Sequence, residues 1–118
     1  MQMQIHVKGL PRSARVRRFA SLKLIAALTP FSHAIETASM HLGDINGPER
    51  GGVDKLCRVV LRMSNSSVVV IEDLGSDIAK VIERVTGRLQ QSVSRQLRQL
   101  VKVDRNGMRP YTFAAVGA

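Results

Sequence analysis

The chain is poor in aromatic residues and in cysteine. Aromatic residues make up 3% of its 118 positions and Trp is absent. The sequence therefore lacks the rows of rings on which sheet surfaces stack single-stranded bases. Its one cysteine, Cys57, has no partner for an intramolecular disulfide. Because Cys57 alternates with apolar neighbours, we expect a small, buried side chain there.

Long apolar runs are also missing. The sequence has no stretch of about 18 apolar residues that could span a bilayer. Its first residues do not follow the order of a signal peptide, in which a basic region precedes an apolar one and a small-residue cleavage site. We therefore expect a cytoplasmic protein without a membrane partner.

Acidic residues are few. Lys and Arg number 18 against 9 Asp and Glu, which gives a formal net charge of +9 at pH 7. The isoelectric point is near 11.1. A chain of this length is one domain's worth of protein, and such a charge attracts polyanions. The composition therefore favours a nucleic-acid-binding domain.

Residues suited to catalysis or metal binding are scattered. His6, His33 and His41 fall on two predicted strands and a loop, without the spacing of a metal site. Asp77 is placed as a helix cap, whereas Glu83 lies on another side of the same helix, so the two make a poor acid/base pair. We expect no enzymatic activity, no metal and no cofactor.

Hydrophobic periodicity predicts four strands and two helices. Alternation of apolar and polar residues predicts strands over 1–7, 34–42 and 55–63. An unbroken apolar run predicts a fourth strand over 67–72, although the run does not show which side is buried. Recurrence at three and four residues predicts helices over 13–28 and 77–102.

Capping and turn residues define the rest of the chain. Ser13 is placed to cap the first helix, and Ser76 with Asp77 to cap the second. Residues 43–52 predict a polar connection. Residues 106–118 show no period and predict a flexible tail. We therefore expect one domain over 1–105, followed by a tail over 106–118.

The predicted order is β-α-β-β-β-α, an α+β fold. A strand, a helix and a following strand of one sheet imply a right-handed crossover, and short turns let the last three strands form an antiparallel meander. Two helices on one face of a four-stranded sheet would bury both apolar helix faces together. We therefore expect a two-layer sandwich.

The last helix combines an apolar face with a stripe of positive charge. Its apolar face is formed by Ile78, Ile82, Val85, Leu89, Val93 and Leu100. The basic stripe is formed by Lys80, Arg84, Arg88, Arg95, Arg98 and Lys102. Like charges four residues apart destabilise a helix, so this stripe favours a polyanion partner over a merely solvated face. We expect it to face outward, beside the first helix.

The first helix carries a lysine within its apolar stripe. Lys23 either lays its methylenes on the core with its ammonium in water, or places that ammonium in a groove between the two helices. Four arginines crowd the start of this helix, where the macrodipole disfavours positive charge: Arg12, Arg15, Arg17 and Arg18. A compensating anion would relieve this arrangement.

These motifs resemble a known family. The run from Asp77 to Glu83, followed by Arg88-Leu89 and Arg95, resembles the last helix of the ribosome hibernation-promoting factors. In that family the helix opens with an Asp-Met-Tyr-Ala-Ala-Ile-Asp type motif and continues with Lys-Leu and further basic residues. Upstream, similar positions are Met3-Gln4-Ile5, Arg17, Phe19 and Lys23-Leu24. The resemblance covers residues 3–103.

The resemblance implies a function in translational inhibition. Members of the family bind the small ribosomal subunit in the channel for messenger RNA and transfer RNA, and inhibit translation by occupying it. The implied partners are that subunit and its rRNA, together with a separate modulation factor in ribosome dimers. We therefore expect a protein of the stationary-phase stress response. Off the ribosome, we expect it to be a monomer. Basic family positions match Arg17, Lys23, Arg88 and Arg95, and the helical stripe adds Lys80, Arg84, Arg98 and Lys102 as rRNA-binding candidates.

The chain also departs from the family pattern. Ala79 replaces a usual Tyr, Ser92 a common Gln and Leu97 a common Lys, and Arg98 is placed to supply the charge lost at Leu97. The chain ends before the second, dimerising domain of the long family members, so it resembles the short form or the related inhibitor with a C-terminal tail.

Two other functions stay open at this point. One is a stand-alone module for double-stranded RNA, since helix arginines suit phosphates and duplex shape. The other is a protein-interaction module that uses Leu22, Ile25 and Leu28, which fall outside the apolar stripe of the first helix.

Overall fold

The computed structural model describes residues 1–45 and 54–105, and the side chains of the last helix as far as Arg98. The predicted tail at 106–118 and most of the predicted connection at 43–52 lie outside the described residues. The side chains of Leu100 and Lys102 do too, so their predicted positions on the helix stay predictions.

The predicted order of elements is confirmed. The elements are β1 (Gln2–Lys8), α1 (Ser13–Leu28), a 3-10 helix η1 (Thr29–Ala34), β2 (Ile35–Asp44), β3 (Lys55–Met63), β4 (Val68–Gly75) and α2 (Ile78–Arg105). The sequence analysis missed η1, which carries Pro30 near its start. It also ended β4 three residues early, before Asp73, Leu74 and Gly75.

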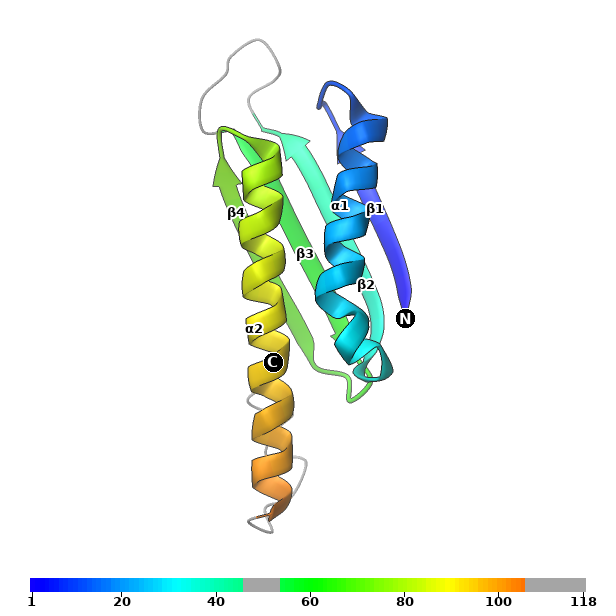
Figure 1. Ribbon diagram of the computed structural model, residues 1–118, viewed down its shortest axis with the longest axis vertical. Coiled ribbons are helices and arrows are strands. Elements are labelled where there is room, and N and C mark those ends of the chain that lie inside the picture. The colour runs from blue at the N-terminus through cyan, green and yellow to red at the C-terminus, as the bar shows by residue number, and fades with distance from the viewer. Residues whose placement is uncertain (46–53, 106–118) are drawn as a thin grey trace.

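The sheet is mixed and open. Its strand order is β1-β2-β3-β4. β1 pairs with β2 in parallel, and β2, β3 and β4 form the predicted antiparallel meander. Figure 1 shows α1 and α2 lying side by side across the same face of the sheet. The predicted α+β two-layer arrangement is therefore confirmed.

Alternation decides which strand residues reach the core. Cys57, Val59, Leu61 and Met63 of β3 are buried beneath the helices, as predicted, while Arg58 and Arg62 are exposed on the other face. The register of β3 with β4 settles the ambiguous apolar run: Val69 is buried, and Val68 and Val70 are exposed. Burial raises the pKa of the Cys57 thiol to about 12, and the nearby Asp73 carboxylate adds to this effect.

The apolar face of α2 is the main cover of the sheet. Ile82, Val85, Leu89 and Val93 are fully buried, as predicted, and Val81 joins them. Burying one such side chain stabilises the fold by about 1.5–3 kcal/mol. Leu28 also lies in this core and has no exposed surface. The proposal that Leu28 belongs to an interaction surface on α1 was therefore wrong.

The two helices begin differently. Asp77 caps α2 as predicted, because its Oδ1 accepts a hydrogen bond from the Ala79 N–H at 3.0 Å. The prediction that Ser13 caps α1 was wrong, since the cap position is Arg12 and no side chain caps this end. Arg12 adopts a left-handed conformation with φ 53°, which places Ser13 inside the first turn.

A lysine joins the end of β2 to the start of β3. Lys55 Nζ donates to Asp44 Oδ2 at 2.8 Å and to Asp54 Oδ1 at 2.9 Å, and both carboxylates are buried. The hydrogen bonds to Asp44 and Asp54 raise the pKa of Lys55. Lys55 is thus committed to the fold and does not add to the charge available for a partner.

Candidate nucleic-acid interface

The predicted binding residues lie on the two helices. Arg17 and Lys23 belong to α1, and the other six belong to α2. Of those whose side chains are described, Lys23 is half-buried and the rest are exposed: Arg17, Lys80, Arg84, Arg88, Arg95 and Arg98. The exposed surface of the two helices is thus strongly basic, but its cations differ in the groups that they already contact.

Two arginines of the stripe share one carboxylate. Arg84 Nε lies 2.8 Å from Asp73 Oδ2, and Arg88 Nη2 lies 2.9 Å from the same oxygen. Asp73 stands on the helix-facing side of β4, in register with Cys57. Arg84 and Arg88 therefore turn toward β4, which corrects the prediction that this part of the stripe lies beside α1. The sequence analysis missed Asp73 because it ended β4 before this residue.

The electrostatics of this cluster keep Asp73 charged. The side-chain hydrogen bond from Arg84 lowers the pKa of the Asp73 carboxyl, and the hydrogen bond from the Leu74 N–H lowers it further. Because one negative charge is shared by two guanidinium groups, the cluster keeps a net positive charge. It remains attractive to a polyanion, though less so than two free arginines.

A glycine makes room for this cluster. A Cβ atom on Gly75 would lie 2.6 Å from Val81 Cγ2 and 2.8 Å from Arg84 Nη2. Arg84 Nη2 donates to the carbonyl oxygen of Leu74 at 3.2 Å. The absence of a side chain at position 75 therefore lets α2 approach β4 closely and lets Arg84 reach the strand.

Lys23 bridges the two helices. Its ammonium lies 3.8 Å from Glu83 Oε1 on α2 and 5.7 Å from the centroid of the Phe19 ring. The ammonium therefore emerges between the two helices, which is the second of the two predicted positions. Side chains of the pair are 43% and 55% exposed, and exposed pairs contribute about 0–1 kcal/mol. Lys23 can therefore exchange Glu83 for a phosphate at little cost.

Arg17 has a structural contact as well. Its Nη1 donates to the carbonyl oxygen of Ile5 at 3.1 Å. This bond ties α1 to the edge strand β1 and occupies one polar backbone group of that edge. The rest of the guanidinium stays exposed.

Arg95 and Arg98 border a groove next to η1. The groove has a volume of about 620 Å³ and includes Phe31 of η1 together with Gly87, Gln90, Gln91 and Ser94 of α2. Among the described residues, neither arginine has an ion-pair partner or a hydrogen bond. Lys80 is likewise exposed and has no such partner among the described residues, so Lys80, Arg95 and Arg98 are the unpaired cations of the described part of the stripe. Phe31, Gln90 and Gln91 were not predicted as part of the site, because only the fold brings η1 against the helix.

The described residues hold neither a candidate metal site nor a candidate membrane span. In the part of the chain that the structure describes, no three His, Cys, Asp or Glu side chains gather closely enough to hold a metal ion. Among those same residues, no helix is long and apolar enough to cross a membrane.

Solved structures share this architecture. A ribosomal subunit interface protein from Coxiella burnetii superposes with a TM-score of 0.65 at 16% identity, covering 80% of this chain and 96% of that one. The N-terminal domain of Protein Y from Thermus thermophilus superposes with a TM-score of 0.61 at 18% identity, covering 80% of this chain and 98% of that domain. The chain has their fold.

Both neighbours are members of the hibernation-promoting factor family. The fold that the sequence resemblance implied is therefore confirmed. No family model matches the chain, and no curated protein matches it by sequence. The shared fold places the two basic helices on the same face of the sheet (Figure 1), and the assignment of binding residues rests on the contacts described above.

Proposed function

We propose that this protein is a ribosome hibernation factor that binds the small ribosomal subunit through the basic face of its helices. The observation that carries the proposal is the row of exposed cations on α2, ending in the unpaired Arg95 and Arg98, on a fold shared with a ribosomal subunit interface protein. By occupying the channel for messenger RNA and transfer RNA, the protein would inhibit translation.

The geometry suits the phosphates of folded RNA. From Lys80 to Arg98 the stripe extends over about 27 Å, at about 1.5 Å per residue. Its guanidinium groups bind phosphates with good geometry and carry little sequence information. A rigid rod of such groups suits RNA whose phosphates are held in fixed positions, as they are in an assembled subunit.

The contacts divide the candidate cations of the two helices into two groups. Arg84 and Arg88 are held by Asp73, and Lys23 by Glu83. Lys80, Arg95 and Arg98 are free among the described residues, and the two arginines border the groove at Phe31. We infer that the free group forms the first contacts with rRNA and that the held group adjusts on binding.

The proposal includes its partners. They are the small subunit with its rRNA, and a separate modulation factor in ribosome dimers. The protein would act in the cytoplasm, as a monomer when off the ribosome.

Co-sedimentation with purified small subunits tests the proposal. The wild-type chain should pellet with the subunit, and messenger RNA together with initiator transfer RNA should displace it. Replacing Arg95 and Arg98 by Gln should abolish most of the binding. The charge-matched control replaces Arg58 and Arg62, which lie on the opposite face of the sheet, and should lose much less of the binding than the Arg95 and Arg98 variant.

The same assay separates the function from that of a general double-stranded RNA module. A hibernation factor should prefer the assembled subunit over naked duplexes by a wide margin. Equal affinity for both, or simultaneous occupancy of the subunit by the protein and messenger RNA, would contradict the proposal.

A further inference from the structure

The face of the sheet opposite the helices is open. Both helices cover the other face (Figure 1). Strand pairing arranges the outward residues in rows that cross the sheet. One row joins Gln4, Ser39, Val60 and Val70, and the next joins His6, His41, Arg58 and Glu72. The face therefore combines amides, hydroxyls, imidazoles and guanidinium groups, with apolar side chains of β3 and β4 among them.

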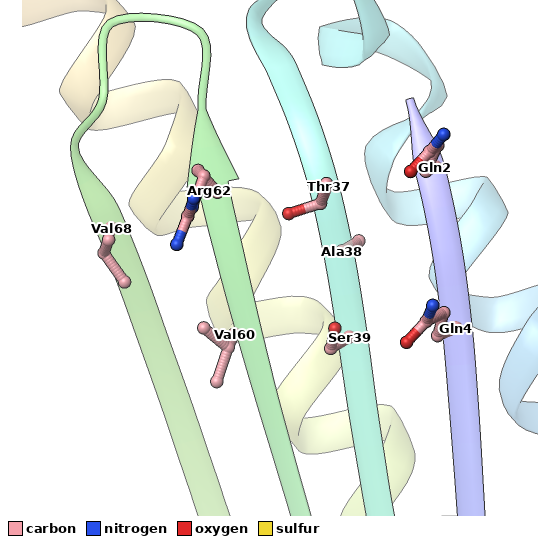
Figure 2. Close-up of a pocket in the computed structure, with 8 residues that line it drawn as sticks. All are labelled: Gln2, Gln4, Thr37, Ala38, Ser39, Val60, Arg62 and Val68. Carbon is pink, nitrogen blue, oxygen red and sulfur yellow. The ribbon is translucent and has the colours of Figure 1, made fainter.

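This face is hollowed between β1 and β3. The hollow has a volume of about 390 Å³, and its polar lining includes Gln2 and Gln4 of β1, Thr37 and Ser39 of β2 and Arg62 of β3, with Val60 beside them. Figure 2 shows these side chains standing on the strands, on the side away from the helices. Pockets that hold drug-sized ligands have volumes of about 300–1,000 Å³, so the hollow has room for one nucleotide.

Two imidazole rings stack beside the hollow. The ring centroids of His6 and His41 are 4.8 Å apart and their planes differ by 13°. The parallel pairing of β1 with β2 sets this contact, since it places His6 directly opposite His41. The stack lies two residues further along each strand than Gln4 and Ser39 of the hollow, a distance of about 6.6 Å. A flat ring bound next to the hollow would therefore reach the stacked imidazoles.

The charge of this face suits a polyanion. Arg62 has no ion-pair partner among the described residues. Arg58 lies 3.9 Å from Glu72, and the side chains of this pair are 52% and 56% exposed, so the pair is weak. An acidic peptide would pair with the arginines but would leave the stacked imidazole rings and the amides of Gln2 and Gln4 without a matching group.

We propose that this open sheet face binds a short stretch of single-stranded RNA. One base lies in the hollow, where Gln4 and Ser39 can hydrogen-bond to its edge. The adjacent base stacks against the His6–His41 pair, and Arg62 and Arg58 contact the phosphates. Stacking of bases on aromatic rings of a four-stranded sheet is a general mode of RNA binding. This site is separate from the basic helices and does not rest on the proposed ribosomal function.

Nuclear magnetic resonance of the isotopically labelled full chain with hexauridylate tests the site. The largest shifts should fall on Gln4, His6, Ser39, His41 and Arg62. An abasic hexamer with the same number of phosphates separates base binding from charge. Hexauridylate should bind at least about tenfold more tightly, because base stacking contributes about 1–3 kcal/mol per base. Equal affinities, or shifts confined to α1 and α2, would overturn the proposal.

Variants of the two faces give a second, independent result. Replacing His6 and His41 by Ala should remove most of the preference for hexauridylate over the abasic hexamer, whereas replacing Arg95 and Arg98 by Gln should leave that preference unchanged. Circular dichroism establishes that each variant is folded. If the histidine variant is folded and keeps the preference, the proposal is wrong. Self-association that is abolished by Val60→Lys would also overturn it, because this face would then be an interface between two copies of the chain.

Discussion

At the scale of single residues, Asp73 sets how much of the basic stripe is available. It holds Arg84 and Arg88 through the same oxygen, at 2.8 and 2.9 Å. The sequence shows the arginines but not their restraint, because the carboxylate comes from a strand that lies beside them only in the fold.

Replacing Asp73 by Asn should strengthen RNA binding. The substitution keeps an oxygen for the Leu74 N–H but removes the charge that holds both arginines. Two more cations then become free to contact phosphates. The dependence of log K on log salt should become steeper by up to about 2, since each phosphate neutralised contributes about 0.9 to the slope. Filter binding of rRNA fragments between low and moderate salt measures this, and an unchanged slope would contradict the role given to Asp73.

The same residue predicts a dependence of stability on pH. Its folded-state pKa is lowered from 3.8 by Arg84 and the Leu74 N–H, so its charged form stabilises the fold. This contribution is complete above the unfolded pKa and is lost as the pH falls through the folded pKa. The wild type should therefore be more stable than Asp73→Asn at pH 7, and the difference should shrink below pH 3.8. Urea unfolding at several pH values measures it, and a difference that persists at the lowest pH would contradict this account.

Two glycines offer a matched pair of substitutions. A Cβ atom at Gly75 would meet Val81 and Arg84, whereas one at Gly87 would meet nothing within 4 Å. We expect Gly75→Ala to destabilise the protein by about 1–3 kcal/mol through overpacking. Gly87 lies exposed within α2, so Gly87→Ala should stabilise the protein by up to about 1 kcal/mol through helix propensity. Urea unfolding measures both free energies, and equal effects would contradict the packing described at β4.

At the scale of elements, α2 was the best predicted part of the chain. Four residues of its predicted apolar face are buried as expected, Ile78 is only partly buried, and the capping by Asp77 is confirmed. α1 was harder, because its exposed face also carries Leu22 and Ile25, which are 62% and 42% exposed. Periodicity alone placed Leu28 with these two residues, but the chain turns into η1 directly after Leu28 and buries it.

This difference within α1 can be measured. Leu28→Ala should destabilise the fold by about 2–5 kcal/mol, as large-to-small changes in a core do. Leu22→Ala should change stability by less than about 0.5 kcal/mol, because it alters an exposed surface. Thermal and urea unfolding give both values. Concentration-dependent sedimentation of the Leu22 variant would separately reveal whether this exposed surface associates with another copy, and similar losses of stability at both positions would contradict the burial of Leu28.

At the scale of the whole molecule, topology organises the surface into two faces with different chemistry. The sequence predicted the basic helix face, since that face depends on local spacing. It did not predict the polar sheet face, which depends on register: His6 and His41 are 35 positions apart in the chain and meet only because β1 pairs with β2 in parallel. The sequence analysis counted only Phe, Tyr and Trp as aromatic residues, and therefore did not consider these imidazole rings as a surface for base stacking. The groove at Phe31 was missed for the same reason, because η1 reaches α2 only in the fold.

The division of the helix face into held and free cations gives a final test on variants of equal net charge. Arg95→Gln with Arg98→Gln, and Arg84→Gln with Arg88→Gln, each remove two positive charges. The first pair should flatten the salt dependence of subunit binding by about 2, from the loss of two phosphate contacts at about 0.9 each. The second pair should flatten it less, because Asp73 already offsets one of its charges. Introduced into the wild type, Asp73→Asn should steepen the slope, because it releases Arg84 and Arg88. Introduced into the variant that lacks both arginines, it should not steepen the slope in this way. If both pairs behave identically, only net charge matters, and the free arginines at the Phe31 groove have no special part in binding.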